Sequence, residues 1–388
     1  MISKFIKIIT FENKRDIYRI YVSHTLHNVA LSVINVYVPI FLLVSGYSLS
    51  KTISFFIVFH IIGLLFALLV FPFLIRKWGL IDLLKIHYPL EIGFLILLNF
   101  LSVLPSLFWI ISVLGGLATF VYWIPFNILL IKHARIEKMG SDLANFFAFP
   151  KVFGILGPLV SAVLVSLIGF WPVFTIVIIG LVISYLPLRG IRNSKVVSSF
   201  DFQLSHVWNK LCKRKLLFLM EGFDNIIEES EWFWCIFVFL IIGTLEAPGI
   251  AKSLEVLGGT AFIIIVGRYI NRNPKGLIPI ASLGLIITWM IRAFIENALP
   301  AYFITLIASF IMTLFLVSYF SMIYRTVKNQ QEEEFLILRE IPTVLGRMIV
   351  FGTILLTLTN LRLFFILPIL TTLILLAIFV SAQKKIVA

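Results

Sequence analysis

Charged side chains are scarce in this sequence. Only 13% of its 388 residues are charged, whereas a typical soluble domain carries roughly 25%. So few charges cannot cover a water-facing surface, which excludes a soluble globular protein. Intrinsic disorder is excluded as well, because 60% of the residues are hydrophobic and the mean hydropathy is +1.06. The composition therefore indicates an integral membrane protein.

The sequence also lacks the signatures of common enzymes and of disulfide-linked scaffolds. It contains no P-loop, no G-x-S-x-G and no C-x-x-C pattern. The two cysteines, Cys212 and Cys235, lie in a basic segment and in an apolar run, so no disulfide framework is expected. We therefore expect neither an enzyme nor a bound cofactor.

The basic residues dominate the formal net charge of +13 and first suggest a nucleic-acid partner. They lie, however, in short segments between apolar runs, as the positive-inside rule describes. With the N-terminus placed inside, the outer loops contain only Lys51, Lys252 and Arg362. We expect no nucleic-acid partner, but a multi-pass protein of the cell membrane, surrounded by lipid, with both termini cytoplasmic and a monomeric state.

Long apolar runs are what the sequence has in abundance. A helical span needs about 20 apolar residues, and strands of a membrane barrel would instead alternate over about ten. The runs therefore predict an all-α protein. Twelve spans are expected, at 20–44, 51–75, 83–104, 107–131, 143–168, 171–188, 216–243, 250–270, 277–298, 300–324, 335–358 and 362–382.

The spans predict two six-helix bundles, 20–188 and 216–382, between a cytoplasmic N-terminal segment (1–19) and a tail (383–388). The linker 189–215 contains Leu204, Val207, Trp208 and Leu211 at helical spacing. This apolar stripe on a short basic helix predicts that the helix lies on the inner membrane surface.

An internal repeat relates the two halves. Four features recur at an offset of 195 to 197 residues, which argues for two parallel six-helix halves with a site between them at the midplane. The matching pairs are His24-x-x-His27-Asn28 with Glu221-x-x-Asp224-Asn225, Gly46 with Gly243, Tyr122-Trp123 with Tyr319-Phe320, and the loop 72–79 with the loop 267–274.

Span count, central loop and repeat resemble the major facilitator superfamily. Its loop signature, G-x-x-x-D-R-x-G-R/K, is partly kept by Gly267, Arg272 and Lys275, with Asn271 at the acidic position. The first-half loop keeps Lys77 and Gly79. The resemblance implies an alternating-access transporter of twelve helices, in which these two loops gate the cytoplasmic side.

Span five contains Gly157-Pro158, followed by Ser161 and Ala162. This resembles the G-P-x-x-G-G motif of antiporters in the same superfamily, with small residues in place of the glycines. Small residues still permit close helix approach, so the resemblance implies a gating role for Gly157 and Pro158 and favours export by antiport. Span four lacks the arginine of the drug–proton antiporters, so their proton mechanism does not carry over.

Span seven contains an acidic face. Glu221, Asp224, Asn225 and Glu228 are spaced so that they share one side of a helix. Ionisable groups within a span face protein or water and mark ion or substrate pathways. We expect these residues to bind protons and substrate; the alternative is that the segment begins outside the membrane as a solvated helix end.

Span one contains a matching polar face of His24, His27, Asn28 and Asn35, which we expect to complete the cavity. The alternative is a set of hydrogen bonds between helices. His24 and His27 with Asp224 also leave open a divalent metal as substrate, although no metal site is our primary expectation.

One basic and several aromatic residues complete the predicted site. Arg347 lies near the middle of span eleven, where it pairs with the span-seven acids or clamps an anionic substrate group. The resemblance implies that spans one, four, seven and ten surround the cavity. Its walls would then include Tyr122, Trp123, Asn127 and Tyr319, and aromatic walls with acidic groups suit a cation.

The sequence therefore predicts a secondary transporter that exports a small amphipathic or cationic compound in a proton-coupled reaction. One alternative is a divalent metal transporter of the same fold. The other is a membrane receptor or scaffold that does not transport.

Overall fold

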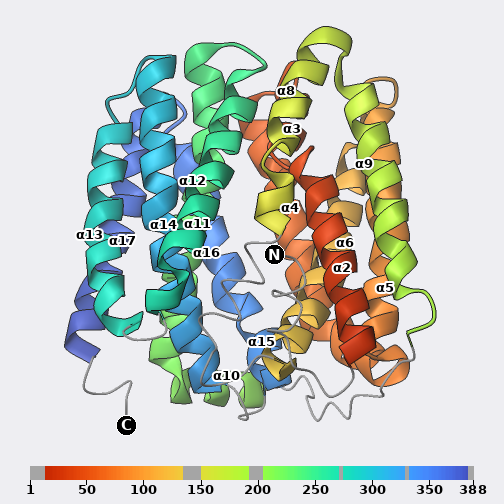
Figure 1. Ribbon diagram of the computed structural model, residues 1–388, viewed down its shortest axis with the longest axis vertical. Helices are drawn as coiled ribbons and strands as arrows, with labels where there is room; N and C mark the ends of the chain where they lie inside the picture. The colour runs from red at the N-terminus through yellow and green to blue at the C-terminus, as the bar shows by residue number, and fades with distance from the viewer. Residues whose placement is uncertain (1–13, 134–149, 192–203, 271–273, 328–331, 383–388) are drawn as a thin grey trace.

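The computed structural model describes residues 14–133, 150–191, 204–270, 274–327 and 332–382, and every regular element in these ranges is a helix. Figure 1 shows two groups of helices side by side, red to yellow-green and green to blue. We call α2 to α9 the N-terminal bundle and α11 to α17 the C-terminal bundle. The prediction of an all-α membrane protein is confirmed.

The N-terminal bundle is built from apolar helices joined by short turns. Its elements are α2 (Lys14–Ser32), α3 (Tyr37–Val44), α4 (Leu49–Leu65), the π-helical turn η1 (Phe66–Val70), α5 (Phe71–Asn99), η2 (Pro105–Leu107), α6 (Phe108–His133), α8 (Gly157–Ile168), α9 (Phe170–Tyr185) and η4 (Leu186–Leu188). A short helical segment, 150–154, precedes α8.

The C-terminal bundle follows a short linker helix, α10. The elements are α10 (Leu204–Lys213), α11 (Lys215–Ile242), α12 (Ala247–Ile270), α13 (Pro274–Arg292), α14 (Ala298–Val327), α15 (Glu332–Leu338), α16 (Glu340–Leu356), η5 (Leu361–Phe365) and α17 (Ile366–Ala382). In α10 the Trp208 side chain is exposed and Lys210 forms an ion pair with Glu334 at 2.9 Å.

Within the described ranges, seven helical stretches are long and apolar enough to cross a membrane. One of them, Leu49–Phe100, contains two of the predicted spans. The chain turns between these two at Gly79, whose φ of 75° lies in a region that side chains disfavour. The acidic α11 falls outside the seven because its charges interrupt the apolar run. The helices are consistent with twelve spans.

The first span is broken between α2 and α3, and α8 packs against this break. A Cβ at Gly157 would collide with Ser32, so α8 and α2 approach closely at that glycine. The Ser161 hydroxyl donates to the carbonyl of Val33, which the break leaves without a helical partner. Gly157 and Ser161 of the predicted span-five motif therefore serve close packing within the N-terminal bundle.

The two ends of the molecule are distinguished by the elements that lie there. In Figure 1, α2 begins and α17 ends at the lower end of the view, and α10 and α15 lie there as well. We call this end the terminal face and the other the opposite face. The turns after α3 and α8, at Gly46 and Gly169, lie at the opposite face.

Candidate functional site

A cavity of about 480 Å³ lies between the two bundles. The N-terminal bundle supplies a wall from α6 and from the segment before α8, namely Thr119, Phe120, Trp123, Ile124, Asn127 and Lys151. The C-terminal bundle supplies residues of α11, α12, α14 and α16, and Arg339 directly before α16. Among them are Glu221, Asn225, Glu228, Glu229, Glu231, Trp232, Lys252, Glu255, Phe320, Tyr324, Arg339, Glu340 and Arg347.

Aromatic rings from both bundles form part of the cavity wall. Trp123 comes from the N-terminal bundle, and Trp232 and Phe320 come from the C-terminal bundle. The Trp232 ring also meets Phe56 of α4 edge-on, with 4.7 Å between ring centroids. Rings that face a cavity present flat apolar surfaces with a negative potential, which suits planar or cationic guests.

Three of the cavity carboxylates are neutralised by direct ion pairs. Glu229 lies 3.2 Å from Arg347, and Glu255 lies 2.6 Å from Lys252. The third pair, 3.7 Å apart, joins the neighbouring residues Arg339 and Glu340. In a setting of low dielectric constant, such pairing lowers the cost of keeping both charges away from bulk water.

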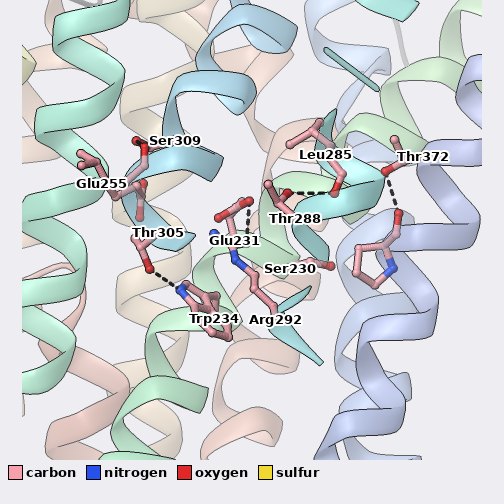
Figure 2. A network of polar contacts seen from close by, with 12 residues as sticks. Ser230, Glu231, Trp234, Glu255, Leu285, Thr288, Arg292, Thr305, Ser309 and Thr372 are labelled. Carbon is pink, nitrogen blue, oxygen red and sulfur yellow. Dashed lines mark hydrogen bonds and ion pairs between the residues drawn. The ribbon is translucent and has the colours of Figure 1, made fainter. Parts of the chain in front are cut away.

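A fourth cavity carboxylate, Glu231, forms an ion pair with a residue that does not itself line the cavity. Arg292 of α13 is fully buried and donates to it at 2.8 Å. The guanidinium also stacks between Trp234 and Trp289, 4.7 and 4.4 Å from their ring centroids. Figure 2 shows this pair and the bond from Trp234 to Thr305. Both partners of the pair are held by packing, which fixes Glu231 at the cavity wall.

Two acidic residues of the cavity wall, Glu221 and Glu228, have no ion pair among the described residues. Both line the cavity. Glu228 is exposed there, whereas Glu221 is buried with one carboxyl oxygen that has no hydrogen-bond partner. The cavity therefore presents two carboxylates that have no cation of the described residues within ion-pair distance.

The structure brings together about half of the predicted binding residues. Those that line the cavity are Glu221, Asn225, Glu228, Trp123, Asn127 and Arg347. Those that do not are Asp224, Tyr319, Tyr122, His24, His27, Asn28 and Asn35. Of these, Asp224 and Tyr319 are fully buried beside the cavity wall, and Asn35 is exposed in the break after α2.

The histidines of α2 face the interior of their own bundle. His24 Nδ1 lies 2.6 Å from the Tyr122 hydroxyl, and His27 Nε2 lies 2.8 Å from His87 Nε2. His87 Nδ1 is 2.9 Å from the Ala118 carbonyl. Because a carbonyl only accepts, a neutral His87 accepts at Nε2 from His27. The expectation that His24, His27 and Asn28 complete the cavity is corrected: these side chains bond helices together.

Asp224 is the repeat counterpart of His27 and is buried like it. Neither of its carboxyl oxygens has a hydrogen-bond partner among the described residues. Burying an ionised carboxylate without a partner is very costly, whereas burying its protonated form costs far less. Asp224 is thus an acidic group that needs a proton, or a rearranged neighbourhood, to stay where the structure places it.

The bundles touch at the opposite face. The Tyr37 hydroxyl donates to the Leu245 carbonyl at 3.0 Å, and the Ser166 hydroxyl donates to Glu246. That hydrogen bond lowers the pKa of the Glu246 carboxyl below its ordinary value. Gly249 of α12 lies so close to Pro158 that a Cβ there would collide with its carbonyl. Pro158 therefore lies at a contact between the bundles.

The bundles also meet at the terminal face and at mid-height. α15 packs against α6 and η1 near the terminal face. At mid-height the Arg347 guanidinium donates to His60 Nδ1 of α4 at 3.2 Å. Of the predicted loop residues, Lys77 is exposed near Phe73, Gly79 forms the turn described above, and Gly267 lies in α12. Asn271 and Arg272 lie outside the described residues.

Several cavity residues escape the sequence-based prediction. Lys252 is predicted as an outer-loop residue, but it lies in α12 and lines the cavity beside Glu255. Their spacing of three residues in a helix is the signal that would have linked them. Arg292, the last residue of α13, is the buried partner of Glu231.

No family profile and no curated protein sequence matches the chain. Solved structures do. A bacterial homologue of the iron transporter ferroportin aligns with a TM-score of 0.70 at 13% identity, over 96% of this chain and 100% of that one. The fucose:proton symporter of E. coli, a major facilitator superfamily transporter, gives 0.70 at 13%, over 94% and 97%.

The nucleoside transporter NupG aligns with a TM-score of 0.66 at 13% identity, over 94% of this chain and 98% of that one. The chain has the major facilitator fold. The resemblance expected from the degraded loop motifs is thus confirmed at the level of fold. These neighbours are transporters.

Proposed function

We propose that the chain is a secondary transporter that moves a small cationic or amphipathic compound by alternating access, in exchange for protons. The observation that carries this proposal is that two carboxylates in a cavity between the bundles, Glu221 and Glu228, have no ion-pair partner among the described residues. A cation entering the cavity would neutralise one of them, and the wall of Trp123, Trp232 and Phe320 would hold its apolar part. Small molecules are thus the expected cargo.

Proton coupling rests on the same acids together with Asp224. A carboxylate that binds either a cation or a proton, but not both, links the two fluxes, because loading of one displaces the other. Among the described residues, the Asp224 carboxyl group has no hydrogen-bond partner, and it lies one turn from Glu228 on α11. We assign Glu228 to exchange between substrate and proton, and Asp224 to holding a proton within the wall.

We also propose a direction of transport and an orientation of the protein in the membrane. The distribution of lysine and arginine favours a terminal face on the cytoplasmic side of a cell membrane. Export then loads the substrate from the terminal face and releases it at the opposite face, where the Tyr37–Leu245 contact would open. The turn that contains Lys77 and Gly79, and the segment from Gly267 to Arg272, whose described part belongs to α12, are assigned to gating of the terminal face.

A divalent metal is the competing substrate, and one structural neighbour is a homologue of an iron transporter. In the described part of the chain, no three His, Cys, Asp or Glu side chains form a group arranged to hold a metal ion. A non-transporting receptor or scaffold is the second competitor, and it is distinguished by the absence of any flux.

Proton-linked flux can be measured directly in liposomes that contain the purified protein and a lumenal pH dye. With the lumen at pH 6 and the outside at pH 8, we add 1-methyl-4-phenylpyridinium, an aromatic cation with no neutral form. We expect the lumen to become alkaline faster than in protein-free liposomes. E228Q should reduce this proton flux by about tenfold or more, the size expected when one charge interaction is lost.

The matched control is E296Q, which removes an exposed carboxylate that pairs with Arg362 outside the cavity. It should transport as the wild type does. If the added cation drives the same proton flux through wild type and E228Q, Glu228 has no part in the coupling mechanism. Flux driven by Fe²⁺ or Mn²⁺ but by no organic cation would favour the metal transporter.

A further inference from the structure

One charged residue of the N-terminal bundle lines the cavity, Lys151, which precedes α8. Among the described lining residues, every other charged side chain comes from the C-terminal bundle. The N-terminal wall is otherwise aromatic, apolar or uncharged. Lys151 therefore gives this wall a single positive charge, opposite a wall with a surplus of negative charge.

Lys151 extends across the interface between the bundles. Its ammonium lies so near Gly259 of α12 that a Cβ at that glycine would be 3.5 Å from it. Its electrostatic partners are Glu255, Lys252 and Glu228, all on the C-terminal bundle. None of these carboxylates lies within ion-pair distance of Lys151, and Glu255 is already paired with Lys252.

The cavity thus contains charges of opposite sign that lie beyond ion-pair distance of each other. On the C-terminal side these are Glu228 and Glu221, and on the N-terminal side the charge is Lys151. A lysine and a carboxylate that face one cavity without touching leave room for a ligand between them. A ligand that satisfies both must present an anionic group to Lys151 and a cationic group to Glu228.

We propose that Lys151 is a specificity-determining residue and that the substrate is a zwitterion, an aromatic compound with one ammonium and one carboxylate group. This inference rests on the proposed function and narrows its substrate class. The carboxylate binds Lys151, the ammonium binds Glu228, and the ring lies against Trp123 and Trp232. A purely cationic compound leaves Lys151 unsatisfied and binds more weakly.

A zwitterion held in this way connects the two bundles. Its anionic end contacts the N-terminal bundle and its cationic end contacts the C-terminal bundle, so binding favours the state in which the walls are close. A ligand with only one charge contacts only one wall by a charge interaction. The zwitterion is therefore the ligand that couples occupancy to closure around the cavity.

Three indole compounds test the inference, because they share one ring and differ in charge: tryptophan, tryptamine and indole-3-propionate. Their dissociation constants are measured by thermal shift on the purified full-length protein, with wild type, K151Q, K151R and the exposed-site control K51Q. We expect wild type and K51Q to bind tryptophan about tenfold or more tighter than tryptamine, and to bind indole-3-propionate most weakly.

K151Q should lose the preference for tryptophan while retaining its affinity for tryptamine, which also shows that the variant is folded. K151R should restore most of the preference. Equal binding of tryptophan and tryptamine by wild type, unchanged in K151Q, overturns the zwitterion and leaves the cation transporter standing. Strongest binding of indole-3-propionate, or the absence of binding by both amines, counts against the zwitterion and the proposed cation site together.

Discussion

The two bundles place equivalent residues in different settings. Asn28 donates to the His24 carbonyl at 2.8 Å, and its repeat partner Asn225 donates to the Glu221 carbonyl at 2.9 Å. His24, however, is bonded to Tyr122 inside its bundle, whereas Glu221 lines the cavity. The repeat has kept the local backbone geometry while one half uses the position for packing and the other for charge.

The aromatic pairs of the repeat behave alike. In each pair the tyrosine, Tyr122 or Tyr319, is buried away from the cavity, and the next residue, Trp123 or Phe320, lines it. Successive helical residues point about 100° apart, so one member of a pair faces the neighbouring helices when the other faces the cavity. Apart from Lys151, the N-terminal bundle therefore supplies uncharged walls of the cavity, and the C-terminal bundle supplies the other charges.

The largest effect is expected at the buried pair of the C-terminal bundle. R292M leaves Glu231 as an uncompensated buried charge, which costs about 3–5 kcal/mol of stability. R362M removes the exposed partner of Glu296 and costs about 0–1 kcal/mol. Thermal unfolding in detergent measures both. Similar shifts for the two variants would contradict the account of Glu231 as a residue fixed by Arg292.

The polar cluster of the N-terminal bundle should matter for stability and not for binding. H27L leaves His87 Nε2 buried without its donor, a loss of about 1–3 kcal/mol. The double variant H27L/H87L removes both partners and should recover part of that loss. Ligand affinity of the folded variants should equal that of the wild type. A specific loss of affinity would return these histidines to the binding site.

The smallest effect is expected at the aromatic wall. W123A removes a ring that faces the cavity and should weaken binding of an aromatic cation by about 0.5–2 kcal/mol, as expected for a cation–π contact. W171A, which removes a largely exposed ring at the opposite face, is the control. Equal affinities of the two variants would place the ligand away from the α6 wall.

The fold was accessible from the sequence because its signals are strong. Apolar runs mark the spans whatever their packing partners, and the offset between His24-x-x-His27-Asn28 and Glu221-x-x-Asp224-Asn225 relates the two halves. Residues of the site could be predicted only where a polar side chain lies far from both ends of a predicted span, as at Glu228 and Arg347. A polar stripe shows that a helix has a special face, but the rotation of that face toward cavity or neighbour depends on packing.

Because packing sets the rotation of a helix, some residues of the predicted polar faces do not line the cavity. His27 and Asp224 lie on the predicted stripes yet point into packed helices, because a stripe is wide enough to cover both a cavity and a contact. Lys252 was predicted in a loop because charge placed near the start of an apolar run resembles a span boundary.

The central claim is that unneutralised carboxylates of the C-terminal bundle bind a positive charge. Thermal stability of purified wild type and E228Q tests it most directly, at pH 6 and pH 8, with 1-methyl-4-phenylpyridinium, fucose, a nucleoside and Mn²⁺. Because protons compete for the same carboxylates, the organic cation should stabilise the wild type more at pH 8 than at pH 6, and should not stabilise E228Q. Stabilisation by the sugar, the nucleoside or the metal alone, unchanged in E228Q, would contradict the claim.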